Sequence, residues 1–334
     1  MRVIQVGVGG FGTSWRPALT TLPDVKVVAL VDINPANLRE AAQFFGLPES
    51  QCFPSDELPW EQVDADVMVH SAPQNYRYAH VIRALRAGKH VLSVKPMSDA
   101  WETGLAMVDE AKRLDRKFVI AHQMRWHPLL LKLKDLVEGG ELGRIGYVHL
   151  DFFYGWGGYT GSYPQAYPLL VQGSIHHFDF LRYVLGVDAR RVWATSFNPP
   201  WIEIDEIKAA YVAVEMANGV KACYRSVPTR TDHCSWLCEW RIEGTKGLAE
   251  VKKDRVYLNG KEILSGWEDG EVFNNRRLPS LQKVVFQHFI DYVNGGPEPD
   301  ISGRNNLNSL ETSMAAIRAG ETGERQELTS CERM

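Results

Sequence analysis

The chain has 334 residues, which at about 150 residues per domain corresponds to roughly two domains. Hydrophobic residues make up 45 % and charged residues 23 %, ordinary globular proportions that exclude a disordered or collagen-like chain. The 41 acidic and 37 basic side chains give a net charge of −4, which argues against a protein that binds nucleic acid electrostatically.

Nothing in the sequence indicates a membrane or secreted protein. It contains no apolar stretch of about 18 residues, so we expect no membrane span. The first apolar run is short, breaks into glycines and is followed by no cleavage-type site, so we expect no signal peptide and a cytoplasmic location. Five cysteines, an odd number without a CxxC pair, favour free thiols in a reducing compartment.

Strands and helices alternate over about the first 120 residues. Apolar runs predict strands over residues 2–8, 25–32, 66–71, 90–94 and 117–121. Helical spacing predicts helices over residues 35–45, 78–87 and 99–114. Buried strands that alternate with helices indicate a parallel sheet covered on both faces. We therefore predict a doubly wound, Rossmann-type α/β domain over residues 1–121.

After about residue 122 the pattern changes to that of an antiparallel sheet. Strands are predicted over residues 145–154, 191–197, 207–216, 220–227 and 236–243, separated by turn signals such as Asn218-Gly219. Helices are predicted over residues 175–185, 280–293 and 305–319. We expect an α+β domain for substrate binding and oligomerisation over residues 122–303. A C-terminal helix and tail over residues 304–334 are expected to pack back on the first domain.

A dinucleotide motif follows the first predicted strand. The segment GVGGFG over residues 7–12 fits GxGxxG and precedes a helix-like segment, which is the context that the motif requires. Its glycines allow a tight turn and a close approach to a pyrophosphate. Asp32 ends the second strand, 20 residues after Gly12, where a carboxylate accepts from ribose hydroxyls and repels a 2′-phosphate. We therefore predict NAD rather than NADP, with these cofactor-binding residues: Gly7, Gly9, Gly10, Phe11, Gly12 and Asp32.

Two further segments follow strands, and the carboxyl ends of parallel strands face the ligand crevice. Ser71, Ala72 and Pro73 could lie along the cofactor, although a plain strand-to-helix turn explains them almost as well. Lys95 follows the strand over residues 90–94, close to where the nicotinamide would lie. Its charge could hold a substrate oxygen, and desolvation could lower its pKa. By itself, a surface lysine before a proline turn is the commoner explanation.

Polar residues gather where the helix over residues 175–185 begins. Gln172 and His176 share a helical face if that helix extends back, and His176 and Asp179 share it too. A histidine can carry a proton between substrate and solvent at neutral pH. A pair formed by His176 and His177 and packed against the sheet is an equally good alternative. A metal site is disfavoured, because adjacent histidines diverge on a helix and no further ligand is evident.

Five segments in this order resemble the Gfo/Idh/MocA oxidoreductases over nearly the whole chain: GVGGFG, VDIN, AGKHVLSVKP, MRWHP and GSIHHFDFLRYVLG. The resemblance implies an N-terminal Rossmann domain and a C-terminal domain with a large, open, mainly antiparallel sheet. In that family the sheet commonly mediates dimers or tetramers. The resemblance also implies hydride transfer between a nicotinamide cofactor and a sugar, cyclitol or related polyol.

The resemblance assigns roles to particular residues. Lys95 matches the family's catalytic lysine and His176 its catalytic histidine. Val94 replaces the glutamate of the family's Glu-Lys-Pro motif, and Gln172 replaces an aspartate that often precedes the histidine. Arg125 matches an arginine that follows the sixth strand of the Rossmann domain. The expected substrate-binding residues are Arg125, Tyr154, Trp156, Gln172 and His177.

These departures leave three interpretations open. We favour an NAD-dependent dehydrogenase or reductase in which Lys95 polarises the substrate oxygen and His176 relays its proton. The second is an enzyme that retains NAD and catalyses a redox-neutral change, such as epimerisation or elimination. The third is a non-catalytic, NAD-binding sensor with a protein partner. For the first we expect a small polyol or sugar substrate, a homodimer or homotetramer, and no nucleic acid, membrane or metal.

Overall fold

The computed structural model describes residues 1–54, 58–155, 166–231, 233–265 and 281–330. The chain divides into two compact units. Unit 1 consists of Met1–Gln123 with Pro279–Asn306, and unit 2 of Met124–Leu278 with Leu307–Met334. No helix in the described ranges is long and apolar enough to cross a membrane.

Two helices near the C-terminal end belong to different units. Helix α8 (Leu281–Val293) packs on elements of unit 1. Most of α9 (Gly303–Thr322) belongs instead to unit 2, where Asn308 bonds both the N–H and the carbonyl of Ala189. The first turn of α9, Gly303–Asn306, belongs to unit 1, and the described residues from Leu307 onward belong to unit 2.

Unit 1 is a doubly wound α/β unit, as predicted. Six parallel strands pair in the order β3-β2-β1-β4-β5-β6, and the order reverses between β1 and β4. The strands are β1 Arg2–Val6, β2 Lys26–Val31, β3 Cys52–Phe53, β4 Val67–His70, β5 His90–Val94 and β6 Phe118–Ala121. The helices between these strands are η1 Gly10–Trp15, α1 Arg16–Thr21, α2 Pro35–Phe45, η2 Glu49–Gln51, α3 Gln74–Arg86 and α4 Trp101–Arg113.

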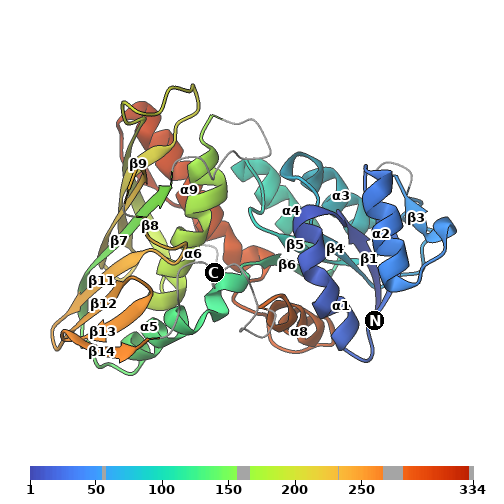
Figure 1. Cartoon of the computed structure of the whole chain (residues 1–334), viewed down its shortest axis with the longest axis horizontal. Helices are drawn as coiled ribbons and strands as arrows, with labels where there is room; N and C mark the ends of the chain where they lie inside the picture. The colour runs from blue at the N-terminus through green and yellow to red at the C-terminus, as the bar shows by residue number, and fades with distance from the viewer. Residues whose placement is uncertain (55–57, 156–165, 232, 266–280, 331–334) are drawn as a thin grey trace. The chain divides into compact units, whose positions relative to one another are not determined.

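Helices cover both faces of this sheet (Figure 1). Helices α3 and α4 pack against each other on one face, and α1 packs with α8 on the other. Local signals define α2: Asn34 caps its first turn by accepting from the Ala36 N–H, and Pro35 follows. Gly46 ends it at φ 68°, a left-handed conformation that glycine adopts at little cost.

Unit 2 is a nine-stranded sheet with the order β14-β13-β12-β11-β7-β10-β9-β8-β15. Its strands are β7 Ile145–Gly155, β8 Ala189–Phe197, β9 Ala209–Met216, β10 Lys221–Thr229, β11 Glu239–Gly244, β12 Leu248–Lys252, β13 Arg255–Leu258, β14 Lys261–Leu264 and β15 Gln326–Glu327. In the described residues β7 and β10 run parallel, and the other neighbouring strands are antiparallel. The expected large, mainly antiparallel sheet is therefore confirmed.

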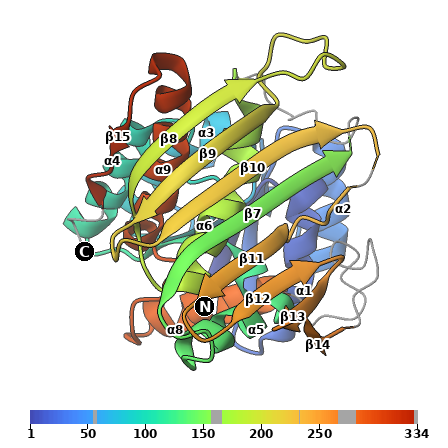
Figure 2. The same cartoon turned by 90° about the vertical axis from the view of Figure 1, so that its left-hand side faces the viewer.

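The two faces of this sheet differ. Along β7 every second side chain from Val148 to Tyr154 is buried, and that face is covered by α5 (Pro128–Glu138), α6 (Ser174–Leu185) and α9 (Figure 1). Figure 2 looks onto the opposite face, over which no described helix of the unit lies. This face carries three large exposed side chains: Tyr147, Trp193 and Tyr211 are 39 %, 39 % and 45 % accessible.

Candidate functional site

The glycine segment after β1 is a tight turn that has no room for side chains on its inner side. A Cβ atom on Gly7, where φ is +77°, would stand 2.3 Å from the Ala72 nitrogen. A Cβ atom on Gly12 would stand 2.0 Å from the Gly7 carbonyl oxygen. Gly10, with φ at +47°, meets nothing within 4 Å on the side where its Cβ would point. The turn is therefore packed inside and open outside, as a cradle for a pyrophosphate must be.

Asp32 holds the same turn from the end of β2. Its Oδ2 accepts from the N–H groups of Val8 at 2.9 Å and Gly9 at 3.2 Å. Its Oδ1 accepts from Asn34 N–H at 2.8 Å and from the Asn37 side chain at 3.1 Å. The carboxylate thus fixes the glycine turn, a role beyond the ribose contact expected from the sequence.

The segment Ser71–Pro73 follows β4 and lies against the glycine turn. The Ser71 N–H donates to the Val6 carbonyl at 2.7 Å, and Ala72 lies beside Gly7. The Ser71 hydroxyl is buried and has no hydrogen-bond partner among the described residues. A buried hydroxyl of this kind calls for a partner, because leaving it unpaired costs free energy. Together with the glycine turn, it makes this edge of the sheet fit a bound dinucleotide.

Lys95 directly follows β5 at the same edge of the sheet, and its peptide bond to Pro96 is cis. Burial of the ammonium group, with the nearby Arg77 guanidinium as the second cause, lowers the pKa of Lys95 to about 8. Taken over the whole residue, Lys95 is partly exposed to solvent. A lysine with this pKa can hold or release a proton near neutral pH, which an ordinary surface lysine cannot.

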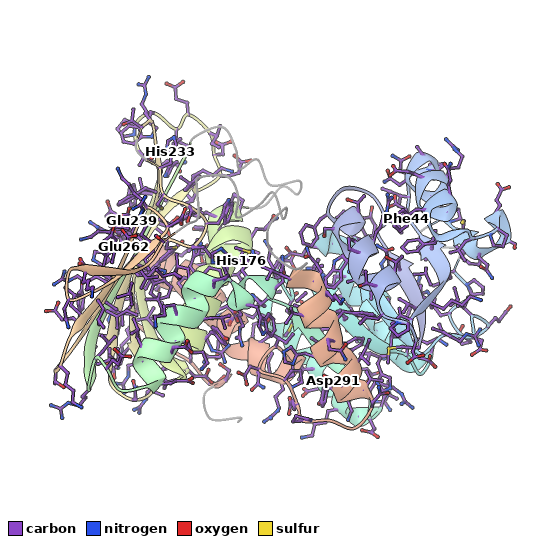
Figure 3. All side chains as sticks on the ribbon, turned by 60° about the horizontal axis from the view of Figure 1, so that its bottom comes forward. Phe44, His176, His233, Glu239, Glu262 and Asp291 are labelled. Carbon is purple, nitrogen blue, oxygen red and sulfur yellow. The ribbon has the colours of Figure 1, made fainter. Side chains whose placement is uncertain are left out.

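His176 lies in the first turn of α6 (Figure 3) and is 7 % exposed. The helix does extend back from its predicted start: Leu169–Gly173 form one π-helical turn directly before Ser174. Gln172 lies in that turn and is partly exposed. Single π-helical turns within helices are frequent at functional sites.

His177 is fully buried and is bonded within the protein. Its Nδ1 lies 2.7 Å from the Tyr224 hydroxyl, and its Nε2 lies 3.1 Å from the Trp236 carbonyl oxygen. Because a carbonyl can only accept, Nε2 donates and Nδ1 accepts from Tyr224. The Ser174 hydroxyl lies 2.9 Å from the same Tyr224 oxygen. This network holds the start of α6 against β10.

Arg125, in η3 (Gln123–Trp126), forms a bidentate ion pair with Asp179 of α6. Its Nε donates to Oδ2 and its Nη2 to Oδ1, both at 2.6 Å, and Ser309 donates to Oδ1 at 3.1 Å. Arg125 is 3 % exposed and Asp179 is fully buried. The charge of Arg125, an expected substrate-binding residue, is therefore matched by that of Asp179, and the pair ties η3 to α6.

Of the two aromatic candidates for substrate binding, only Tyr154 lies among the described residues. Tyr154 is 8 % exposed, and its hydroxyl donates to the Lys208 carbonyl at 2.7 Å. Burial raises the pKa of Tyr154, so its phenol stays neutral. Trp156, the second candidate, lies outside the described residues.

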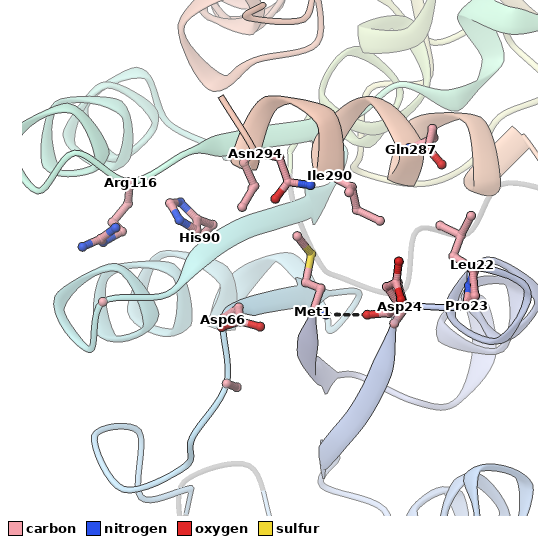
Figure 4. A pocket seen from close by; sticks show the side chains of 14 residues that line it. Met1, Leu22, Pro23, Asp24, Asp66, His90, Arg116, Gln287, Ile290 and Asn294 are labelled. Atoms are coloured by element: carbon pink, nitrogen blue, oxygen red, sulfur yellow. Dashed lines mark hydrogen bonds between the residues drawn. The ribbon is translucent and has the colours of Figure 1, made fainter. Parts of the chain in front are cut away.

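A cavity of about 670 Å³ in unit 1 lies away from these residues (Figure 4). Its wall includes Met1, Asp66, His90 and Arg116, which stand before or at the amino ends of the parallel strands. Ligands of open α/β sheets bind at the carboxyl ends. We therefore separate this cavity from the candidate site.

Sequence reasoning missed three residues that shape the site. Gln5, buried in β1, donates to the Gly12 carbonyl at 2.9 Å. Asn37 of α2 bonds Asp32, and Arg77 of α3 reaches the segments after β4 and β5. The available signal was a glutamine within a predicted buried strand and an arginine on the buried face of a helix, because both residue types are mostly exposed in proteins. Their partners, however, depend on the tertiary fold.

Two family models match consecutive parts of the chain. The first, described as the oxidoreductase family with an NAD-binding Rossmann fold, matches residues 1–122. The second, described as the GFO/IDH/MocA C-terminal domain, matches residues 130–250.

Curated relatives match nearly the full length of the chain. The myo-inositol 2-dehydrogenase of Thermotoga maritima is 26 % identical over 338 residues, which cover 96 % of each chain. The D-glucoside 3-dehydrogenase of Escherichia coli is 23 % identical and covers 98 % of this chain and 97 % of its own.

Solved structures share the fold of the whole chain. An oxidoreductase from Agrobacterium radiobacter, in complex with NAD+, L-tartaric acid and magnesium, has a TM-score of 0.83 at 19 % identity over 98 % of both chains. The WlbA dehydrogenase from Bordetella pertussis, in complex with NADH and UDP-GlcNAcA, has a TM-score of 0.83 at 22 % identity. It covers 98 % of this chain and 97 % of its own.

Proposed function

Because the chain belongs to the Gfo/Idh/MocA family of NAD-binding oxidoreductases, we propose that it transfers a hydride between NAD and a carbinol or ketone carbon of a sugar, cyclitol or related polyol. The observation that carries this proposal is Lys95, whose pKa is lowered to about 8 at the sheet edge that also holds the glycine turn. The names of relatives that act on inositol and glucosides support the substrate class.

The residues of the glycine turn and Asp32 would hold the dinucleotide. Gly7, Gly9, Gly10 and Gly12 let its pyrophosphate approach the backbone, with Phe11 exposed between them. Ser71, Ala72 and Pro73 would line the cofactor beside this turn. Bound NAD+ would supply the hydride acceptor, and NADH the donor. The Asp32 carboxylate disfavours the 2′-phosphate of NADP, because two negative charges would meet there.

Lys95 would act on the substrate oxygen. In its charged form the ammonium group donates a hydrogen bond to that oxygen and favours negative charge on it. At pH values near 8 a substantial fraction of Lys95 is neutral and can accept the hydroxyl proton as a general base. Since Val94 precedes it, no carboxylate at that position opposes the loss of the proton.

His176 would pass the proton on. Gln172 and Tyr154 would contact the substrate. A glutamine can orient an imidazole but cannot stabilise imidazolium by charge, so His176 would hold a proton only briefly. The Arg125–Asp179 pair and the His177–Tyr224 bond fix the helix that carries it. We assign these last residues positioning roles.

We also propose a cytoplasmic homodimer or homotetramer that forms through the nine-stranded sheet. The exposed Tyr147, Trp193 and Tyr211 support this assembly, because large aromatic side chains on an uncovered sheet face favour a protein contact. Four cysteines in the described part of the chain are free thiols, which supports a reducing compartment.

The first experiment mixes the purified protein with NAD+ and a panel of cyclitols, hexoses, sugar acids and glycosides, and follows NADH formation. Lys95→Ala is expected to lower kcat by at least about 100-fold, the usual contribution of a general base. Its NAD affinity should stay within a few fold. Lys112→Ala, at an exposed site on α4, is the matched control and should retain wild-type activity.

The outcomes separate the candidate functions. NADH formation that survives in Lys95→Ala would refute the role of Lys95. No NADH with any substrate, together with tight NAD binding, would contradict the dehydrogenase. Product analysis by mass would then distinguish a redox-neutral enzyme from a sensor that converts nothing.

A further inference from the structure

Arg77 is an unusual residue in unit 1. It lies in the first turn of α3 and is 3 % exposed, yet it forms no ion pair among the described residues. Its guanidinium donates instead to two backbone carbonyls, that of Pro96 and, at 3.4 Å, that of Ala72. Burying a charge without a carboxylate partner is costly, so the hydrogen bonds to the two carbonyls must offset part of that cost.

The two carbonyls belong to the two segments that matter for the proposed chemistry. Ala72 lies against Gly7 of the glycine turn, where a Cβ would stand 2.3 Å from its nitrogen. Pro96 directly follows Lys95. One rigid, planar group therefore links the backbone that lines the cofactor to the backbone that carries the lysine.

We propose that Arg77 is a positioning residue, which couples the cofactor-lining segment Ser71–Pro73 to Lys95 and fixes both against the glycine turn. This inference rests on the proposed function for the role of Lys95. It concerns only contacts within unit 1.

The charges around Arg77 are consistent with this role. Burial lowers the pKa of Arg77 to about 10, so it stays protonated at neutral pH, and Asp99 opposes that shift. The positive charge of Arg77 adds to burial in lowering the pKa of Lys95. Arg77 also acts on His70, whose Nε2 is 3.2 Å from His80 Nδ1: burial first and then the charge of Arg77 keep the pKa of His70 low.

Two substitutions separate the charge of Arg77 from its two hydrogen bonds. Arg77→Met keeps the length of the side chain but removes both properties. Arg77→Lys keeps the charge but lacks the planar fork that reaches two carbonyls. Arg83→Met, at an exposed site on the same helix, is the matched control.

Two measurements do not depend on turnover. The NAD dissociation constant is measured by calorimetric titration. The pKa of Lys95 is measured from its 15Nζ chemical shift in lysine-labelled protein and is assigned by the loss of that signal in Lys95→Arg. Circular dichroism and thermal melting show whether each variant is folded.

Arg77→Met is expected to raise the NAD dissociation constant about tenfold and the pKa of Lys95 by about 0.5–1 unit. Arg77→Lys should leave the pKa within about 0.3 unit of wild type but weaken NAD about threefold. Wild-type values for both quantities in folded Arg77→Met would overturn the proposal. If Arg77→Met does not fold, a wild-type NAD affinity in Arg77→Lys overturns it instead.

The same data distinguish this inference from the proposed function. If no polyol is oxidised but Arg77→Met changes both quantities, Arg77 is a positioning residue and the proposed reaction is refuted. If NADH formation depends on Lys95 but Arg77→Met changes neither quantity, the proposed reaction is supported and the positioning role of Arg77 is refuted.

Discussion

At the scale of single residues, the properties of Lys95 come mainly from what surrounds its ammonium group. The family motif would place a glutamate before it, and a carboxylate there would raise the pKa of the lysine. Here Val94 occupies that position, and the neighbouring charge that acts on Lys95 is the positive one of Arg77. Both differences favour the neutral lysine.

The rate of polyol oxidation should therefore depend on pH through Lys95. With a folded-state pKa of about 8, the neutral base becomes more abundant as pH rises, so kcat/KM should increase and level off above about pH 8. Initial rates between pH 6 and 10 would check this. Lys95→Arg, which stays charged, should lose the rise. A profile in which kcat/KM falls as pH increases from 6 to 8 contradicts the role of base.

Asp32 has a double role that predicts a particular selectivity. Asp32→Ala removes the acceptor of the Val8 and Gly9 N–H groups as well as the charge that opposes a 2′-phosphate. NAD binding should weaken about tenfold or more, and NADP binding should weaken much less. Calorimetric titration with both cofactors measures the ratio. Equal losses for NAD and NADP would show that Asp32 only supports the turn.

At the scale of elements, the sequence predicted those whose signals are local. Helix α2 begins and ends where Asn34, Pro35 and Gly46 indicate. The predicted strand over residues 236–243 was too long at its start, because Cys238 has φ at +65° in a turn. The sequence also did not reveal that β7 pairs with β10 in parallel, since that pairing joins segments some 70 residues apart and depends on the tertiary fold.

In the candidate site, too, residues with a local sequence signal could be predicted, and contacts that depend on the tertiary fold could not. The glycine turn, Asp32 and Lys95 could be found because a motif, a spacing and a strand end are all readable in one segment. The ion pair of Arg125 with Asp179 could not be found, because its partners are 54 residues apart. The sequence therefore predicted which residues are polar near the site but not which of them bond each other.

The glycine turn gives a testable contrast between two glycines. Gly12→Ala places a Cβ 2.0 Å from the Gly7 carbonyl, so the backbone must move and NAD binding should be lost. Gly46→Ala, at φ +68° in open space, should cost only about 1 kcal/mol of stability and leave NAD binding intact. Urea unfolding and NAD titration compare the two. A Gly12→Ala protein with wild-type NAD affinity would refute the packing of the turn.

At the scale of the whole molecule, the proposed oligomer rests on the face of the nine-stranded sheet that no described helix of unit 2 covers. Tyr147, Trp193 and Tyr211 come from three different strands, and their side chains alternate with buried ones. Ion pairs such as Arg225–Asp151 lie on the same face. Apolar and paired polar groups together are typical of an interface between protomers.

Trp193→Glu should therefore weaken self-association. A charge in the middle of an apolar contact is expected to raise the dissociation constant of the oligomer by about 30-fold or more. Sedimentation velocity over a range of concentrations measures this. Phe44→Glu, at a 49 % exposed site on α2, is the control and should not change the sedimentation coefficient. An unchanged oligomer in Trp193→Glu would exclude this face as the interface.

The assignment of α8 to unit 1 has a consequence for how the protein is made. Leu281, Val285, Phe286 and Phe289 of this helix are buried, and they come from a segment that follows nearly all of the second sheet in the chain. A ribosome thus completes the nucleotide-binding unit only after it has translated about 150 residues of the other unit. A nascent chain that stops at residue 123 holds all six strands of this sheet but lacks α8, so chaperones would meet a complete sheet with the apolar surface under α8 uncovered.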